Sequence, residues 1–351
     1  MNFKPLNIDG LIAKYPIVQG GMGVGISLDK LAGNVALCGG VGIISTAQIG
    51  FKEPGYDKAP LETNLKAIKK YIDRAKEIAK GGVVGVNIMV ATKHYEEYVK
   101  AAVKAGIDLI VSGAGLPTKL PELVKNTKTK IAPIVSSVKS AKVICKLWDR
   151  HYGKSPDMVV IEGPKAGGHL GFTKDEVENI TDEQYDNEIV AIKEVVDEYS
   201  KKYNKHIPVI FGGGVYDKAD VEHYMGLGID GVQMATRFVT TYECDATDEY
   251  KQAYLDATEE DIHIVKSPVG MPGRAIRNPF IAKTQEGPIK PTKCRQCLAT
   301  CTSKDIPYCI ADALLNAADG NVDDALIFCG AKAYKSTKLE HVSDIFDEIL
   351  S

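Results

Sequence analysis

The chain has 351 residues, of which 44% are hydrophobic and 25% are charged, as is usual for a globular protein. Its formal net charge is -3 and it shows no basic stripe, which argues against nucleic acid as a partner. No run is long and apolar enough to span a bilayer, so we expect no membrane partner, and residues 1–16 lack the apolar core of a signal peptide. Eight cysteines in such a chain indicate a reducing compartment, and we expect a cytoplasmic protein.

Apolar runs alternate with amphipathic stretches from Tyr15 to Phe238. Continuous β-branched strands separated by helices indicate a parallel sheet covered by helices, and this length suits a closed (β/α)₈ TIM barrel. An open doubly wound sheet is the alternative, but no GxGxxG motif opens the first helix. We expect Ser27 and Asp217 to cap helices. The predicted strands are 15–22, 41–47, 83–90, 108–114, 132–138, 158–163, 208–215 and 231–238, and the main helices are 27–38, 62–80, 94–105, 120–126, 140–151, 182–203 and 217–227.

The pattern changes beyond Tyr242, and we divide the chain accordingly. Residues 1–242 form the predicted barrel, 243–335 a lid-like segment that contains cysteines, and 336–351 a region with a terminal helix. Residues 263–290 are rich in proline and glycine, so we expect loops there that lie over the barrel mouth.

The carboxyl ends of the predicted strands carry mostly glycine and small polar residues. In a barrel these ends form the reactive face, and a phosphate often binds between the last two loops. Gly213 and Gly214 follow the seventh strand, while Ala235 and Thr236 follow the eighth, which predicts a phosphate site. Arg237 either adds a guanidinium to that site or packs against helices.

The stretch MVVIEGPKAGGHLGF, residues 158–172, combines a buried strand with a glycine-rich turn and one histidine. His169 is a candidate general acid or base, because an imidazole titrates near neutral pH. The alternative is a solvated loop histidine. Asn87 interrupts an apolar strand, so it either holds the polar edge of a heterocycle or ties two strands together. Glu162 either accepts from a ligand or pairs with Lys165.

Four cysteines form a C-x₂-C-x₃-C-x₇-C series near the C-terminus, at Cys294, Cys297, Cys301 and Cys309. The first spacing suits a metal clip. No histidine lies nearby, and the whole series matches neither a zinc ribbon nor a ferredoxin. We therefore expect no metal here and favour reduced thiols that pack a small subdomain. A metal-binding or redox-sensing protein built on these residues is the alternative.

Several motifs together resemble the nitronate monooxygenase (2-nitropropane dioxygenase-like) family of FMN-containing barrels. These motifs are PIVQGGMG, GVNIMV, EGPKAGGHLG, FGGGV and GVQMATRF. The flavin-dependent enoyl-ACP reductases share that architecture. The resemblance covers about residues 5–240 and continues through the lid-like segment.

The resemblance implies FMN at the barrel mouth and assigns a role to residues of each motif. His169 matches the family histidine that acts on the proton of the substrate. The family commonly has Gln at the position of Glu162, Glu at that of Lys165 and Gly at that of Ala235. The implied cofactor-binding residues are Gly213, Gly214, Ala235 and Thr236 at the phosphate, Gly21, Met22 and Gly23 along the ring, Asn87, Glu162, Gln233 and Gly167 on its polar side, and Gly168 and Met234 from the same motifs.

The resemblance favours an FMN-dependent nitronate monooxygenase that oxidises alkyl nitronates with O₂. The alternative is an NAD(P)H-dependent FMN reductase that acts on an enoyl thioester of acyl-carrier protein or on a quinone. Such a reductase needs a basic patch at the mouth, for which Arg274, Arg277, Lys283 and Lys290 are candidates. A homodimer is compatible with either function.

Overall fold

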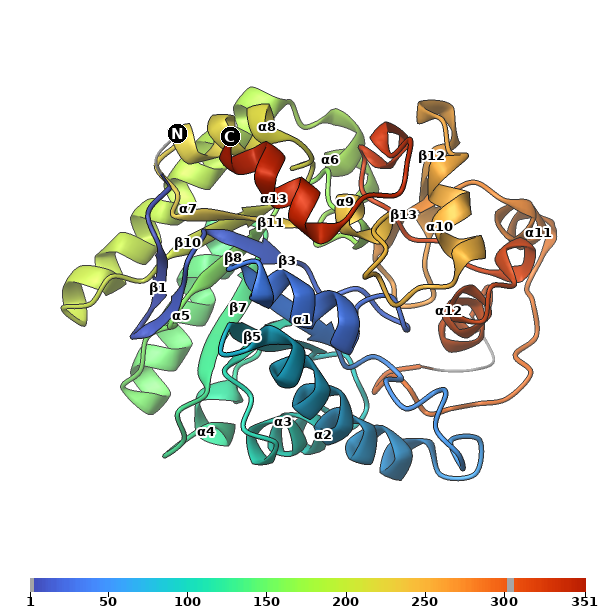
Figure 1. Cartoon of the computed structure of the whole chain (residues 1–351), viewed down its shortest axis with the longest axis horizontal. Helices are drawn as coiled ribbons and strands as arrows, with labels where there is room; N and C mark the ends of the chain where they lie inside the picture. The colour runs from blue at the N-terminus through green and yellow to red at the C-terminus, as the bar shows by residue number, and fades with distance from the viewer. Residues whose placement is uncertain (1–2, 302–305) are drawn as a thin grey trace.

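Eight parallel strands close into a barrel in the computed structural model, which describes residues 3–301 and 306–351. The strands follow one another around the barrel in sequence order, and β11 pairs with β3 to close it (Figure 1). The predicted TIM barrel is therefore confirmed. The strands are β3 (Ile17–Gln19), β4 (Val41–Ser45), β5 (Val83–Met89), β6 (Leu109–Gly113), β7 (Lys130–Val135), β8 (Val159–Glu162), β10 (Val209–Gly212) and β11 (Gly231–Met234).

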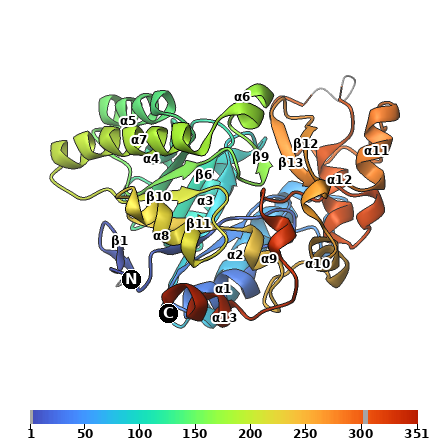
Figure 2. The same cartoon turned by 90° about the horizontal axis from the view of Figure 1, so that it is seen from above.

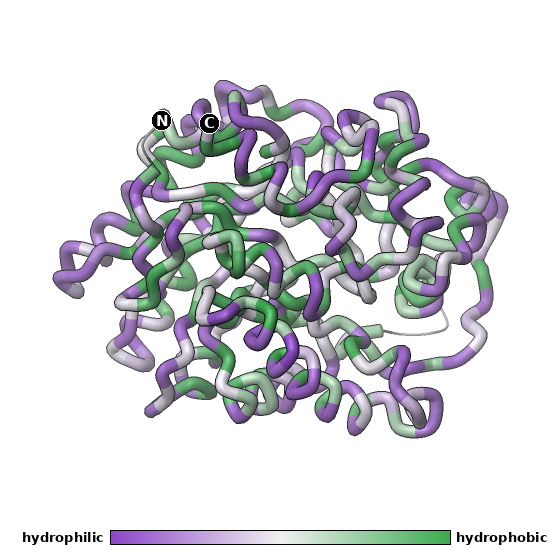
Figure 3. The backbone as a smooth tube through the Cα atoms, in the orientation of Figure 1, coloured by the Kyte–Doolittle hydropathy of each residue, from purple (hydrophilic) through white to green (hydrophobic). Residues whose placement is uncertain are grey.

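Helices surround the barrel and cover its outer surface (Figure 2). Apolar residues concentrate on the central strands and polar residues on the outer helices, as Figure 3 shows. Buried aliphatic side chains between the two layers form the main core. These helices are α1 (Asp29–Leu37), α2 (Pro60–Ala79), α3 (Tyr95–Lys104), α4 (Leu120–Leu123), α5 (Val138–Tyr152), α6 (Lys174–Asn179), α7 (Asp182–Lys202), α8 (Lys218–Gly226) and α9 (Thr236–Val239).

A hairpin of β1 (Leu6–Ile8) and β2 (Leu11–Ala13) closes the amino-terminal end of the barrel. Leu6 and Ile8 pack against the barrel interior in one buried cluster. With this end filled by side chains, ligand access is left to the opposite end, where the strands finish.

The two predicted helix caps had different outcomes. Asp217 caps α8 as predicted, since its carboxylate accepts from the backbone N–H of Asp220. The prediction for Ser27 was wrong: its hydroxyl instead accepts from Met22 N at 2.8 Å. Asp245 occupies the start of α1, where its carboxylate accepts from Leu28 N at 2.7 Å. Ser27 thereby fixes the loop after β3 rather than the helix.

Residues 262–286 contain regular structure that the sequence did not suggest. Strands β12 (Ile262–Lys266) and β13 (Pro272–Ile276) form an antiparallel sheet with the short strand β9 (Gly168–His169). The prediction of loops in this segment was therefore wrong. The remaining helices are α10 (Asp248–Leu255), α11 (Pro279–Glu286), α12 (Ile310–Ala318) and α13 (Val342–Leu350).

The eighth barrel strand is shorter than predicted. It ends at Met234, and α9 begins two residues later at Thr236. This early change from strand to helix places the start of α9 at the barrel mouth. Among the described residues, no helix has both the length and the apolarity needed to cross a membrane.

Candidate functional site

A cavity of about 450 Å³ lies at the carboxyl ends of the barrel strands. Almost every predicted site residue lines it. Met234 is the exception, because its side chain is 1% exposed in the core between strands and helices. The lining includes the predicted residues Gly21, Met22, Gly23, Asn87, Glu162, Gly167, Gly168, His169, Gly213, Gly214, Gln233, Ala235 and Thr236.

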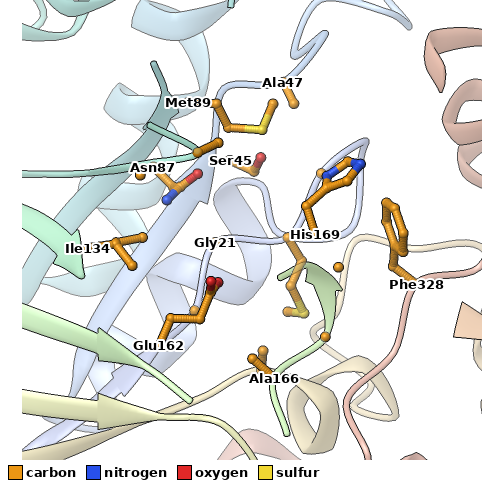
Figure 4. A pocket seen from close by; sticks show the side chains of 18 of the residues that line it. Gly21, Ser45, Ala47, Asn87, Met89, Ile134, Glu162, Ala166, His169 and Phe328 are labelled. Atoms are coloured by element: carbon orange, nitrogen blue, oxygen red, sulfur yellow. The ribbon is translucent and has the colours of Figure 1, made fainter. Parts of the chain in front are cut away.

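The floor of the cavity is made by the loop after β3 and by polar side chains of the neighbouring strands. Gly21 leaves no room for a side chain, because a Cβ atom there would lie 2.4 Å from Cβ of Asn87. Asn87 and Glu162 extend into the same open space from two sides (Figure 4). A glycine backbone flanked by amide and carboxyl groups suits the flat polar edge of a heterocyclic ring.

Glu162 lies at the end of β8 with little to stabilise a negative charge. Its carboxylate accepts one hydrogen bond, from Gly171 N at 3.2 Å. Lys165 does not pair with it, because its ammonium lies 2.6 Å from Asp182 instead. Burial raises the pKa of Glu162 to about 7, and the Gly171 bond opposes that rise only in part. A neutral carboxyl group can donate as well as accept a hydrogen bond.

His169 faces the cavity from β9, on the side opposite Glu162 (Figure 4). Its Nε2 atom lies 2.6 Å from the hydroxyl of Ser267, and its ring meets the edge of Phe328 at 4.8 Å between centroids. Burial lowers the pKa of His169 to about 4. The imidazole is therefore neutral near pH 7, and the hydroxyl of Ser267 fixes the direction of one ring nitrogen.

A glycine-rich turn after β10 and the start of α9 form a cradle of backbone N–H groups beside this space. Gly213 and Gly214 have φ angles of +139° and +83°, which side-chain-bearing residues rarely adopt. Thr236 begins α9, and its hydroxyl accepts from Gly330 N at 2.9 Å. Backbone amides at a helix start and in such turns bind anions, so this cradle can hold a phosphate.

Arg237 does not take part in that cradle. Its guanidinium is buried and lies 2.5 Å from Glu348 and 3.3 Å from Glu340. It also donates to the carbonyl of Tyr216 at 3.2 Å. Of the two alternatives for Arg237, packing against helices is the one that the structure bears out.

The segment after the barrel supplies the second wall of the cavity. Gly167 packs directly on this segment, because a Cβ atom there would lie 2.6 Å from the backbone of Cys329. Arg274 is 7% exposed and donates to the carbonyls of Pro164, at 2.9 Å, and Ala166. It therefore holds β13 against the glycine-rich loop and contributes nothing to a basic surface patch. Lys283 pairs with Asp324 at 2.5 Å, which weakens that patch further.

Sequence reasoning missed the residues that this second wall contributes. Ser267 and Phe328 contact His169, yet they lie far from it in sequence and belong to no recognised motif. The pairing of β13 with β9, with β12 and with Phe328 brings them near. The further lining residues from this part of the chain are Val269, Met271, Cys297, Leu298, Ile310, Ala311, Leu314, Cys329, Gly330, Ala331 and Lys332.

Comparisons with known proteins identify related chains and barrels. A model of the nitronate monooxygenase family matches residues 4–351. A probable nitronate monooxygenase of Staphylococcus saprophyticus is 27% identical over 302 residues, which are 80% of each chain. FabK of Thermotoga maritima has a TM-score of 0.72 and 25% identity, over 96% of this chain and 92% of its own. Nitroalkane oxidase of Streptomyces ansochromogenes has a TM-score of 0.73 and 17% identity, over 96% of this chain and 95% of its own, and so supports the fold alone.

Proposed function

The chain belongs to the nitronate monooxygenase family, whose members are flavin-dependent oxidoreductases, and from this we propose that it oxidises alkyl nitronates with O₂ by means of FMN. The barrel cradle, the cavity and the neutral histidine support this proposal. The observation that carries it is the position of His169 in the cavity wall, with its Nε2 atom 2.6 Å from the hydroxyl of Ser267.

The residues present fit FMN at three points. The backbone of Gly213 and Gly214, with the start of α9, would hold the phosphate. The loop at Gly21 would lie along the ring, and Asn87 and Glu162 would meet its polar edge. When bound, FMN would supply the electron acceptor for the nitronate and the centre that reacts with O₂.

A neutral imidazole suits a substrate that arrives as an anion. An imidazole with a pKa of about 4 is a weak base, so it removes a carbon-bound proton from a neutral nitroalkane slowly. A nitronate has already lost that proton. His169 can instead donate a hydrogen bond to a nitronate oxygen, while Ser267 holds the ring in place.

The test compares an alkyl nitronate with its conjugate nitroalkane under O₂ at pH 7. We expect the nitronate to turn over at least roughly a hundred times faster, because one side chain supplies general-base catalysis of about that size. His169→Ala should lower nitronate turnover roughly tenfold, the value of one hydrogen bond to an anion, and should retain its flavin. Equal rates on both substrates would contradict the proposal.

The likeness to FabK, at 25% identity, supports a second candidate function. This is an NAD(P)H-dependent FMN reductase of an enoyl thioester or a quinone. An anaerobic visible spectrum separates the two. A flavin band that bleaches promptly with NADH or NADPH favours the reductase, and one that responds only to a nitronate favours the monooxygenase.

A further inference from the structure

Two lysine side chains line the cavity beside the cradle of backbone N–H groups. Among the described residues of the lining, Lys165 and Lys332 are the ones that carry an ammonium or guanidinium group. The stem of Lys165 lies against the glycine turn of the cradle, because a Cβ atom on Gly214 would lie 3.0 Å from its Cβ and 3.2 Å from its Cδ. Positive charge at this place favours a ligand with an anionic group.

A strap near the C-terminus, residues 329–336, joins the parts of the cradle. Gly330 N donates to the hydroxyl of Thr236 at 2.9 Å, and the next backbone N–H donates to the carbonyl of Lys165 at 3.1 Å. Only glycine fits at position 330, since a Cβ atom there would lie 2.5 Å from that hydroxyl. The strap is thus bound to the start of α9 and to the loop after β8, and it places Lys332 in the cavity wall.

Lys332 is held at the glycine turn of the cradle. Its ammonium pairs with Asp220 in the first turn of α8, and the other carboxylate oxygen of Asp220 accepts from Tyr216 N at 2.9 Å. Tyr216 comes two residues after Gly214, so this pairing fixes the ammonium near the turn. Among the described residues, Asp220 is its one hydrogen-bond partner. An ammonium group has three N–H donors, which leaves two for a ligand in the cavity.

The ammonium of Lys165 can change its partner. It lies 2.6 Å from Asp182, whose side chain is 72% exposed. An ion pair so open to water contributes little to stability. A phosphate monoester carries a charge of about −1.5 to −2 at pH 7 and has three acceptor oxygens, so it attracts an ammonium more strongly than one carboxylate does. Lys165 can therefore exchange Asp182 for a phosphate in the cradle.

Two other cations near the cradle do not line the cavity. Arg237, at the start of α9, has its guanidinium 2.5 Å from Glu348. Lys335, in the strap, has its ammonium 2.8 Å from Asp217. Both are absent from the cavity lining in the part of the chain that the structure describes. The two lysines of the lining are therefore the cations that a ligand in the cradle can reach.

We propose that Lys165 and Lys332 bind the phosphate of the flavin and give the site its preference for a phosphorylated flavin over an unphosphorylated one. The inference rests on the proposed function, because it takes FMN as the cofactor. Backbone N–H groups carry only partial charges, so the cradle alone does not balance a phosphate that is nearly doubly negative. Two ammonium groups supply the balancing charge, and the strap keeps one of them in place.

The test compares FMN with riboflavin, which has the same ring and ribityl chain but no phosphate. Each flavin is titrated into the full chain freed of flavin, and the ratio of the two dissociation constants reports the phosphate contacts. We expect wild type to bind FMN at least roughly a hundred times more tightly than riboflavin. Lys332→Gln should lower this preference roughly tenfold, and Lys165→Gln, whose side chain is more exposed, roughly threefold. A lysine that acted only on folding would affect both flavins alike.

Lys335→Gln is the matched control. It removes an ion pair of the same kind from the same strap without changing the cavity lining, so the preference for FMN should stay at the wild-type value. An unchanged preference in Lys332→Gln, or an equal fall in Lys335→Gln, would overturn the inference and leave the proposed cofactor standing. A wild-type chain that binds neither flavin would overturn the proposed cofactor, and the inference with it.

Discussion

The cavity has two walls of different construction. The barrel wall consists mainly of backbone, presented by glycines at the ends of β3, β8 and β10 and by Ala235 and Thr236 after β11. The C-terminal wall consists of side chains such as Ser267 and Phe328, held by a three-stranded antiparallel sheet. The first wall is fixed by the closed barrel, whereas the second depends on a few hydrogen bonds between distant segments. We infer that the barrel wall holds the cofactor and that the C-terminal wall controls the chemistry of the substrate.

The two walls also differ in their titratable groups. Burial raises the pKa of Glu162 on the barrel wall to about 7 and lowers that of His169, which contacts the other wall, to about 4. Between about pH 4 and pH 7 the carboxyl group of Glu162 is therefore protonated and the imidazole of His169 is neutral, so neither group is charged. With both groups neutral, neither side chain repels an anionic substrate or forms an ion pair with it, so hydrogen bonds from the cavity walls hold the substrate.

The largest effect should come from adding a side chain to the barrel wall. In Gly213→Ala the new Cβ would lie 2.9 Å from Gly163, at a φ of +139°. Such strain costs about 1–3 kcal/mol, so FMN should bind roughly ten to a hundred times more weakly. Flavin titration of the apoprotein measures this. Gly226→Ala on α8, where no atom lies within 4 Å, is the control and should bind FMN normally. Normal binding by both variants would contradict the assignment of the cradle.

The next effect concerns the link between the two walls. Arg274→Gln should leave the carbonyls of Pro164 and Ala166 without their donor. Two buried acceptors without partners should lower the free energy of unfolding by about 3 kcal/mol. Urea denaturation measures this loss. Arg277→Gln alters an exposed neighbour and should change stability by less than about 0.5 kcal/mol. If the two variants were equally stable, Arg274 would not hold the walls together.

A smaller effect should separate the substrate wall from the cofactor wall. Ser267→Ala removes the hydroxyl 2.6 Å from His169 Nε2 without touching the barrel. We expect nitronate turnover to fall roughly tenfold, the value of one hydrogen bond, and flavin content to stay unchanged. Ser267→Thr keeps a hydroxyl and should restore most of the activity. Loss of flavin in Ser267→Ala would show that the walls do not act separately.

The difference between the walls also decides what the sequence could predict. The barrel wall follows from local patterns, because apolar strands and the glycines at their ends are neighbours in the chain. Gly213 and Asn87 could thus be placed at strand ends, and both line the cavity. Met234 could not, because a β-strand alternates its side chains between two faces and the register was unknown. Its side chain points into the core.

The C-terminal wall could not be predicted for a different reason. The contact of His169 with Ser267 joins residues 98 positions apart through the pairing of β9 with β13. Short strands next to proline and glycine look like loops in the sequence. Arg274 looked like a surface charge for the same reason, although two backbone carbonyls hold it inside the protein.

The smallest predicted effect concerns the pH dependence of the stability of the apoprotein. It tests whether the pKa of Glu162 is raised and that of His169 is lowered. The folded-state pKa of Glu162, about 7, exceeds its ordinary value of 4.5, so the folded protein binds more protons in that range. Its contribution to stability therefore falls as the pH rises from 4.5 to 7. The folded-state pKa of His169, about 4, is below its ordinary value of 6.5, so its contribution rises as the pH rises from 4 to 6.5. In the wild type the fall in stability caused by Glu162 and the rise caused by His169 largely cancel as the pH rises.

Glu162→Gln should remove the fall in stability with pH that Glu162 causes and leave the rise that His169 causes. The variant should gain about 1 kcal/mol of stability between pH 4.5 and 6.5 relative to its own value at low pH, once screening by water in the cavity is allowed for. Urea denaturation of the apoprotein across that range measures the change. Glu162→Gln combined with His169→Asn should be flat again, because neither titrating group remains. If the single variant were as flat as the wild type, at least one of the two groups would titrate at its ordinary pKa, and the inferred uncharged state of the cavity would be wrong.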